Sequence, residues 1–362
     1  MVFNRIAVKI GSNVLARPDG SLDFTRMSSL VDQVAELHRK GVEVIMISSG
    51  AVASGRSEMK NSVPKVLDPL SSRQLFSAVG QVKLINRYYE LFREHDIVCG
   101  QILTTKENFA TRRHYLNQKH CMEVMVDNGV IPIVNENDTI SVTELMFTDN
   151  DELSGLIASM MDAQALIILS NIDGVYDGNP SEPQSKVILD IAPDADIDSD
   201  SFVQTTKSSF GRGGMATKYR ISHKVAEEGI EVIIANGKRD NILLDIASGN
   251  RNVPYTVFHP NPEPVSSMKK WIAHSEGFAK GQIQVNECAY RTLESSAATS
   301  LLSVGVTKIT GDFEKGDIVC IISPEGDTFA VGRTSFGSEK ARDLIGKKGT
   351  RPLIHCDYLY IY

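Results

Sequence analysis

The sequence predicts an α/β fold: a mostly parallel sheet sandwiched by helices, followed by a small C-terminal β-barrel. Two observations predict it. Over about the first 258 residues, short apolar, β-branched runs alternate with segments of helical period. Beyond a proline-rich connector, the apolar runs become short and glycine turns separate them. The chain has 362 residues, a length that favours about two domains.

The predicted strands of the first part are apolar throughout, which is typical of strands buried on both faces of a sheet. They cover residues 6–10, 42–47, 98–103, 130–134, 165–169 and 232–235. Helical periodicity covers residues 25–40, 72–93, 109–127, 151–161 and 215–228. In parallel sheets of this kind ligands bind beyond the carboxyl ends of the strands, so the strand-to-helix turns are where a site is expected.

The pattern changes near Tyr255. Residues 259–264 read H-P-N-P-E-P, which is typical of a stiff connector. Short strands are predicted beyond it at residues 281–285, 304–309, 317–322, 328–332, 352–355 and 358–362. We therefore predict a first domain of residues 1–258, a linker of residues 259–276 and a β-rich domain of residues 277–362.

Composition restricts the class of protein. Apolar residues make up 42% of the chain, and the net charge of −7 argues against a general binder of nucleic acid or membranes. The five cysteines show no C-x-x-C spacing, so we expect reduced thiols in a cytosol. The first strand begins within about five residues of the start, leaving no room for a signal peptide. No apolar run approaches the roughly 20 residues that span a bilayer. We expect a cytoplasmic protein.

Three glycine turns could hold phosphate: the first two follow predicted strands, and the third leads into the predicted helix 215–228. They are residues 9–13 (K-I-G-S-N), 48–55 (S-S-G-A-V-A-S-G) and 211–218 (G-R-G-G-M-A-T-K). Glycines let backbone N–H groups approach a phosphate, helix N-termini attract anions, and lysines add charge. The alternatives are a structural turn for the first, a plain helix cap for the second and a surface loop for the third.

Three polar clusters are predicted at the same edge of the sheet. Residues 133–138 (I-V-N-E-N-D) and 148–152 (T-D-N-D-E) bring carboxylates and amides, and residues 170–176 (S-N-I-D-G-V-Y) could wrap a nucleotide. Carboxylates can hold an ammonium group, and amides can hold a carboxylate. Turn and helix-cap duty is the alternative for all three.

None of the eight histidines falls in these motifs, and neither a transition-metal cluster nor a Ser-His-Asp arrangement is evident. The predicted site thus lacks an obvious neutral base. It fits a nucleophile that is already ionised at pH 7, such as a substrate carboxylate with a pKa of about 4. Attack of a carboxylate on a γ-phosphoryl group needs positioning and charge neutralisation more than proton removal.

The motifs together resemble the amino acid kinase family, and within it the glutamate 5-kinase subfamily. They are V-K-I-G-S-N, S-S-G-A-V-A-S-G, V-N-E-N-D, D-N-D-E-L-S, D-G-V-Y and G-G-M-A-T-K. The tail, with G-V-T-K-I-T-G-D-F-E-K-G-D-I-V and F-A-V-G-R-T, resembles a PUA domain. The resemblance implies ATP-dependent phosphorylation of the side-chain carboxylate of L-glutamate to L-glutamyl 5-phosphate, the first step of proline biosynthesis, with Mg²⁺ arriving on ATP.

The resemblance also implies roles for single residues. Lys9 and Lys218 match two lysines that flank the transferring phosphoryl group, and Asp151 matches the aspartate that holds them. The glutamate-binding positions match Ser49, Gly50, Asp138 and Asn150. The ATP-binding positions match Lys9, Gly11, Ser170, Asn171, Arg212, Gly213, Gly214, Met215, Ala216, Thr217 and Lys218. No metal ligand from the protein is implied.

Two positions depart from the family pattern. Asn171 stands where an aspartate is usual, so the expected contact to the ribose or base lacks a carboxylate. Arg212 stands where a threonine is usual, and either contacts phosphate or points to solvent.

Rival interpretations stay open. Another kinase of the family would act on N-acetylglutamate, aspartate, carbamate or a nucleoside monophosphate; the Asp138 carboxylate suits a free α-ammonium, which N-acetylglutamate lacks. PUA domains usually contact RNA, but residues 278–362 hold ten Lys+Arg and ten Asp+Glu, without the basic surplus that RNA binding needs. The resemblance further implies a homo-oligomer, dimer or tetramer, and proline as a feedback inhibitor.

Overall fold

The computed structural model describes residues 3–60, 67–141, 147, 150–193, 214–263, 266–295 and 299–362. The chain divides into two compact units. Unit 1 comprises Met1–Asn108 and Arg113–Pro264, and unit 2 comprises Phe109–Arg112 and Val265–Tyr362.

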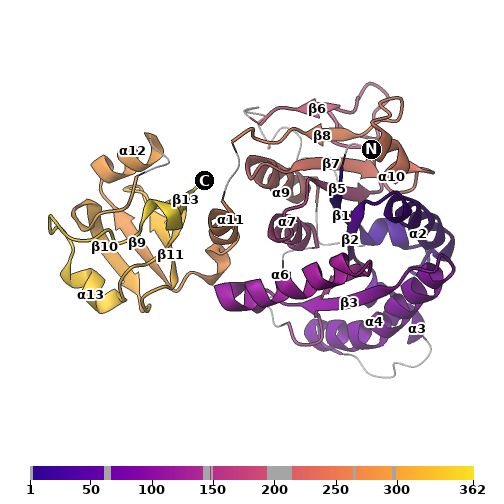
Figure 1. Cartoon of the computed structure of the whole chain (residues 1–362), viewed down its shortest axis with the longest axis horizontal. Coiled ribbons are helices and arrows are strands. Elements are labelled where there is room, and N and C mark those ends of the chain that lie inside the picture. Colours follow the sequence, from indigo (N-terminus) through magenta and orange to yellow (C-terminus); the bar gives the residue numbers. More distant parts are fainter. Residues whose placement is uncertain are drawn as a thin grey trace. The chain divides into compact units, whose positions relative to one another are not determined.

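Unit 1 is built on one eight-stranded sheet with the order β3-β4-β2-β1-β5-β7-β8-β6 (Figure 1). Its strands are β1 (Arg5–Ile10), β2 (Glu43–Ser48), β3 (Cys99–Thr104), β4 (Ile131–Glu136), β5 (Ala165–Ser170), β6 (Asp190–Ile191), β7 (Glu231–Asn236) and β8 (Thr256–Phe258). Neighbouring strands run parallel except β7 and β8, which pair antiparallel. The predicted mostly parallel sheet is confirmed.

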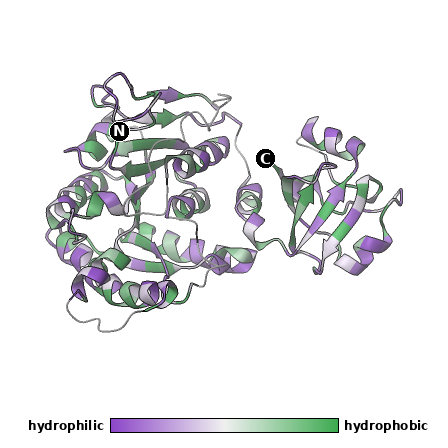
Figure 2. Cartoon of the chain, turned by 180° about the vertical axis from the view of Figure 1, so that it is seen from behind, coloured by the Kyte–Doolittle hydropathy of each residue, from purple (hydrophilic) through white to green (hydrophobic). Residues whose placement is uncertain are grey.

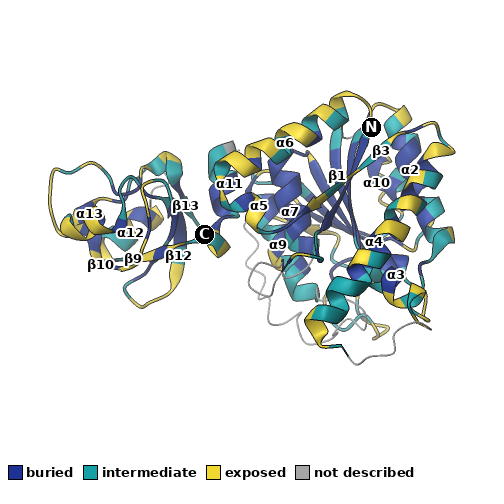
Figure 3. Cartoon of the chain, turned by 90° about the horizontal axis from the view of Figure 1, so that it is seen from below, coloured by how far each residue is buried: buried dark blue, intermediate teal, exposed yellow. Residues whose placement is uncertain are grey.

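The helices of unit 1 cover both faces of this sheet (Figure 3). They are α1 (Ser12–Leu15), α2 (Phe24–Arg39), α3 (Ala51–Glu58), α4 (Pro69–Arg93), α6 (Arg112–Asp127), α7 (Asn150–Met160), α9 (Met215–Glu227) and α10 (Ile242–Ser248), while α5 (Glu107–Ala110) begins in unit 1 and ends in unit 2. On one face α2 contacts β2, α4 and α10, and on the other α7 contacts β1 and α9. Unit 1 thus forms three layers, as the alternation of strands and helices predicts.

The centre of the sheet is apolar because strands covered on both faces exclude water (Figure 2). In β1, Ile6, Val8 and Ile10 join the core shared with α2, while Ala7 is also fully buried. The exception in this strand is Lys9, which is 5% exposed and lies near its carboxyl end. A buried ammonium needs a partner, so its position already marks the site.

The start of α4 is fixed by its own sequence. Pro69 occupies the first turn, and the Asp68 side chain accepts hydrogen bonds from the Leu70 and Ser71 backbone N–H groups, both at 3.0 Å. This cap sets where the first turns of α4 lie, one of which carries Arg73.

One prediction about the strands is wrong. The segment 98–103 is not buried on both faces: β3 is the edge strand of the sheet, Val98 is 60% exposed and Leu103 is 39% exposed. An apolar run reports on strand formation, but the position of the strand in the sheet decides how much of it is covered.

Unit 2 is built on a five-stranded sheet with the order β10-β9-β11-β12-β13. Its elements are α11 (Ser267–Ala273), η2 (Glu276–Phe278), β9 (Gly281–Val285), α12 (Glu287–Ser295), η3 (Ser303–Gly305), β10 (Val306–Gly311), β11 (Ile318–Ile322), β12 (Thr328–Arg333), α13 (Ser338–Asp343), η4 (Cys356–Tyr358) and β13 (Leu359–Ile361). Its own apolar core includes Ile283, Phe313 and Ile321. A separate small β domain is therefore present, as predicted.

Two local features of unit 2 differ from the expectation. The predicted strand 352–355 is reduced to an isolated bridge between Ile354 and Leu301, because Leu353 and Ile354 turn into the core rather than extend along a partner strand. The segment expected as linker contains α11, whose Trp271 indole N–H donates to the Phe109 carbonyl at 3.0 Å. Over the described residues, no helix is long and apolar enough to cross a membrane.

Candidate active site

A cavity of about 790 Å³ lies at the carboxyl ends of the strands of unit 1. It is lined from β1, β4 and β5, from the turn after β2 and from the first turns of α3, α4, α7 and α9. The sequence-predicted residues that line it are Lys9, Gly11, Ser49, Gly50, Asp138, Asn150, Asp151, Ser170, Asn171, Gly214, Met215 and Lys218. Segments up to about 200 residues apart in the chain thus meet where the sheet topology places a ligand.

Two lysines share one carboxylate in this cavity. The Lys9 Nζ atom lies 2.6 Å from Asp151 Oδ1, and the Lys218 Nζ atom lies 2.9 Å from Asp151 Oδ2. The three side chains are 6%, 10% and 1% exposed, in the order Lys9, Lys218 and Asp151. Both carboxylate oxygens are engaged, so Asp151 holds the two ammonium groups on either side of itself.

Electrostatic interactions keep the Asp151 carboxylate charged. Burial raises the pKa of the Asp151 carboxyl, but the charges and hydrogen bonds of Lys9 and Lys218 outweigh burial and hold that pKa below its ordinary value. At neutral pH the carboxylate is ionised, and the trio of Lys9, Lys218 and Asp151 carries one net positive charge. Such a group attracts an anion.

Asn150 connects the turn after β2 with the end of β4. Its side-chain amide donates to the Ser49 hydroxyl at 2.9 Å and to the Asn135 side-chain oxygen at 3.1 Å. Asn135 donates in turn to Gln81 of α4 at 2.9 Å. Gly50 precedes α3 with φ +108°, a conformation that favours glycine. The chain can therefore reverse sharply after Ser49 and still present it to the cavity.

A second charged cluster lies where β4 ends. The Arg73 guanidinium nitrogen Nη2 lies 2.9 Å from Glu136 Oε2, and the same nitrogen contacts Asp138 Oδ1. The other Glu136 oxygen, Oε1, accepts the Phe147 backbone N–H at 3.0 Å. Arg73, Glu136 and Asp138 have side chains that are 15%, 5% and 10% exposed, respectively. This trio carries one net negative charge and attracts a cation.

The loop after β5 forms another part of the wall. Ser170 is 7% exposed and Asn171 is exposed, and both line the cavity. Just beyond them, Asp173 accepts two hydrogen bonds from Arg239, at 2.7 and 2.8 Å, and one from Asn236 at 3.0 Å. The hydrogen bonds from Arg239 lower the pKa of Asp173. The loop is thus tied to the end of β7.

Of the predicted ATP-binding residues, two do not line the cavity and two are not described by the structure. Ala216 and Thr217 lie in the first turn of α9 but are not among its lining residues. Arg212 and Gly213 lie outside the described residues, as do residues 148–149 of the T-D-N-D-E motif.

Sequence reasoning gave no role to several residues that the cavity brings in. They are Ser12, Asn13, Arg56, Arg73, Asn135 and Glu136. Glu136 belongs to a motif already singled out, and its burial could be inferred from the apolar strand before it. Arg73 carries no such signal, since it is one basic residue in a helix, 63 positions from Glu136.

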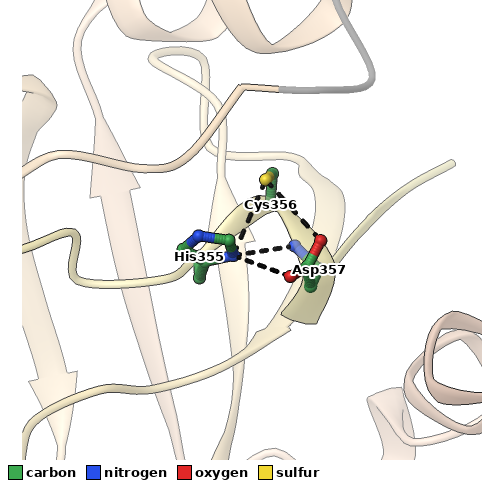
Figure 4. Close-up of side chains that lie close together, drawn as sticks. All are labelled: His355, Cys356 and Asp357. Atoms are coloured by element: carbon green, nitrogen blue, oxygen red, sulfur yellow. Dashed lines mark hydrogen bonds and ion pairs between the residues drawn. The ribbon is translucent and has the colours of Figure 1, made fainter.

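A different polar group lies in unit 2, within the part of the chain that the structure describes (Figure 4). His355 Nδ1 lies 3.6 Å from Cys356 Sγ and 3.3 Å from Asp357 Oδ2, close enough for three metal ligands. The same Nδ1 atom accepts the Asp357 backbone N–H at 3.3 Å, which caps η4. His355 and Asp357 are exposed, and capping accounts for the arrangement.

Comparison with known proteins identifies the fold. The profile of the Amino acid kinase family matches residues 4–236. The chain belongs to the amino acid kinase family. The PUA domain profile matches residues 281–353, within unit 2. The domain boundaries at residues 258 and 277 themselves stay a prediction.

Full-length relatives place the chain within this family. Glutamate 5-kinase from Bacteroides thetaiotaomicron is 67% identical over 359 residues, covering 99% of both chains. Glutamate 5-kinase from Chlorobaculum tepidum is 46% identical over 365 residues, covering 99% of this chain and 98% of its own length. Among solved structures, carbamate kinase from Giardia lamblia bound to AMP-PNP shares the fold of the kinase domain, with a TM-score of 0.52 and 14% identity over 72% of this chain and 99% of its own.

Proposed function

We propose that the protein transfers the γ-phosphoryl group of ATP to the side-chain carboxylate of L-glutamate, giving L-glutamyl 5-phosphate, the first step of proline synthesis. Relatives that match the whole chain at 67% and 46% identity carry the name glutamate 5-kinase. The observation that carries the proposal is the opposite net charge of the two ends of the cavity.

Each end of the cavity suits a different group of the substrates. Lys9, Lys218 and Asp151 form the end with a net positive charge, which suits a carboxylate and the phosphates of ATP. The Arg73, Glu136 and Asp138 cluster forms the end with a net negative charge, which suits an ammonium group. A zwitterionic amino acid with a distal carboxylate offers both charges in one molecule.

The two ends of the cavity come from different strands. Lys9 lies in β1 and Asp138 follows β4, and these strands are separated by β2, which corresponds to roughly 10 Å between their backbones. A substrate that reaches both ends must carry its ammonium group and its reacting carboxylate several bonds apart, as glutamate does.

In the proposed step a glutamate carboxylate oxygen attacks the γ-phosphorus of ATP. A new P–O bond forms to the substrate, and the P–O bond to the β-phosphate breaks, leaving ADP. Lys9 and Lys218 neutralise the charge of the moving phosphoryl group, and Asp151 positions both lysines. No general base is needed, because the attacking carboxylate is ionised at pH 7.

The remaining residues of the cavity are assigned by their place in it. Ser49, Gly50, Asn150 and Asp138 bind glutamate, with Asp138 facing the α-ammonium group. Gly11, Ser170, Asn171, Gly214 and Met215 bind ATP, which we expect as the Mg²⁺ complex. The described carboxylates Glu136, Asp138 and Asp151 are all paired with cations, which supports a metal held mainly by the phosphates of its own nucleotide.

An ATP-consumption assay with hydroxylamine tests the proposal. Glutamate, N-acetylglutamate, aspartate, carbamate and UMP are compared side by side, because other members of the family act on such substrates. Hydroxylamine converts an acyl phosphate into a stable hydroxamate, so we expect hydroxamate with glutamate alone. Equal turnover of N-acetylglutamate would contradict the role of Asp138, since that substrate has no ammonium group.

Further expectations concern regulation and location. We expect proline to inhibit competitively with glutamate, because its ammonium and carboxylate groups suit the Asp138 and Asn150 region; activity unchanged in millimolar proline would contradict this. We expect a cytoplasmic protein. We also expect a homo-oligomer, dimer or tetramer, and light scattering would check its size. We expect the PUA domain not to bind RNA, and a salt-dependent shift with mixed RNA would contradict that.

A further inference from the structure

The two carboxylates at the end of β4 share one cation. A single guanidinium nitrogen, Arg73 Nη2, contacts both Glu136 and Asp138. The two acidic side chains are only 5% and 10% exposed, so water screens their mutual repulsion poorly. Arg73 therefore offsets the repulsion between the two carboxylates.

Each partner in this cluster has a distinct structural role. Glu136 is fully committed: Oε2 accepts from Arg73 and Oε1 accepts the Phe147 backbone N–H at 3.0 Å. Asp138, two residues further on, lines the cavity together with Arg73 and Glu136, and it contacts Arg73 through Oδ1. Glu136, at the end of β4, therefore holds the Arg73 side chain of α4 in place. Asp138 is the carboxylate within reach of a ligand.

We infer that Arg73 is a positioning and specificity-determining residue, which keeps Glu136 and Asp138 both ionised so that Asp138 meets the substrate ammonium group as an anion. The inference rests on the proposed function and adds to it the residue that sets the charge of the ammonium site. Arg73, Glu136 and Asp138 together carry one net negative charge, which an amino acid's ammonium group complements. A neutral ligand or an N-acylated amino acid leaves that charge unbalanced.

Removal of Arg73 changes what the cluster binds. Two neighbouring carboxylates that lose the cation between them take up a proton more readily than they do beside it. That proton then competes with the ammonium group of the substrate. Among the residues that the structure describes, the other charged side chains that line the cavity are Asp151, its two partners Lys9 and Lys218, and the exposed Arg56 of α3.

The decisive measurement is the KM for glutamate from pH 6 to 8.5 in wild type and Arg73→Met, with hydroxamate as the readout. In this range the distal carboxylate of glutamate is ionised, and its titration does not interfere. We expect the variant to have a KM on the order of 10- to 100-fold higher at pH 7, with a much smaller change in kcat. The ratio of the two KM values should rise as the pH falls, by up to about tenfold per pH unit, because one proton competes with one ammonium group.

Charge-balanced variants separate this role from a structural one. Arg73→Lys keeps the cation and should restore most of the wild-type KM and remove the pH dependence of the ratio. The double variant Arg73→Met with Glu136→Gln leaves Asp138 without a neighbouring carboxylate, so its KM ratio should also be independent of pH. Arg93→Met, an exposed arginine later on α4, is the matched control and should behave as wild type.

The outcomes are distinguishable. A wild-type protein that forms no hydroxamate from glutamate contradicts the proposed function, and the inference falls with it. If the wild type forms hydroxamate from glutamate but the ratio of the Arg73→Met KM to the wild-type KM stays constant with pH, the inference about Arg73 alone is overturned. If Arg73→Met fails to fold, the Arg73→Lys variant decides: a ratio of its KM to the wild-type KM that still rises as the pH falls would overturn the role of the positive charge.

Discussion

Gly55 of α3 and Gly80 of α4 lie where the two helices touch backbone to backbone. A Cβ atom on Gly80 would overlap the Ala51 carbonyl and the Gly55 nitrogen, and one on Gly55 would overlap the Phe76 carbonyl. This contact holds together the helix that starts after Gly50 and the helix that carries Arg73. The positions of Ser49 and Arg73 in the proposed glutamate site therefore depend on two glycines that do not line the cavity.

The first prediction tests this contact with Gly80→Ala. The added methyl group meets backbone that cannot move aside locally, so the helices must separate, and we expect the free energy of unfolding to fall by about 1–3 kcal/mol. The KM for glutamate should rise because Ser49 and Arg73 shift apart. Urea unfolding and steady-state kinetics check both. Val82→Ala, at a 69% exposed position of α4, is the control and should leave both unchanged.

The second prediction concerns Lys218→Met. Lys9 and Lys218 lie on either side of Asp151, and removal of one cation leaves part of the transition-state charge uncompensated. We expect kcat to fall about 10²- to 10³-fold at saturating glutamate and ATP. Arg220→Met removes an exposed cation from the same helix and should retain full activity. Undiminished turnover in Lys218→Met would refute the proposed role of the lysine pair.

The third prediction is a pH dependence of stability that arises from Asp151. Its pKa is lower in the folded protein than the unfolded value of about 3.9, since the two lysines outweigh burial. Its stabilising contribution is therefore present above the unfolded value and is lost as the pH falls through the folded value. Asp151→Asn leaves two buried ammonium groups without their partner, and we expect a loss of about 3–5 kcal/mol at pH 7.

The difference between wild type and Asp151→Asn should stay constant above about pH 5 and shrink below about pH 4. Urea unfolding of both proteins at pH 7, 5 and 3.5 measures it. Asp240→Asn removes a carboxylate that is 88% exposed and pairs with Arg26 at 3.4 Å, so it should cost less than about 1 kcal/mol at every pH. A difference for Asp151→Asn that grows on acidification would have the wrong sign.

The sequence predicts the parts of this site that local chemistry determines. Lys9 stands out because an ammonium interrupts an apolar strand, and Gly50 because a strand ends in a turn that needs glycine. Both signals lie within a few residues. The exposure of Leu103 could not be predicted, since it depends on β3 being the edge strand.

Long-range pairings escape sequence reasoning for the same physical reason. Arg73 reaches Glu136 because α4 packs on α3 through Gly80 and because β4 pairs with β2. Neither the helix packing nor the strand order is written in the residues next to Arg73. The Val-Asn-Glu-Asn-Asp motif marks carboxylates at the sheet edge, but the cation that accompanies them becomes visible only in the folded chain.

The last prediction concerns the loop after β5, which carries Ser170 and Asn171 into the cavity. Arg239 donates two hydrogen bonds to Asp173 and so ties this loop to the end of β7. The Arg239 side chain is 40% exposed, and partly exposed pairs contribute at most about 1 kcal/mol, so Arg239→Met should raise the KM for ATP by no more than about fivefold.

The KM for glutamate should not change in Arg239→Met, because Ser49, Asn150 and Asp138 are held by other contacts. Arg251→Met breaks a comparable pair with Asp190, at 2.6 Å and away from the cavity, and should change neither KM. Steady-state kinetics with each substrate varied in turn separates the cases. An equal rise of both KM values in Arg239→Met would mean that the loop supports the whole cavity and not the nucleotide end alone.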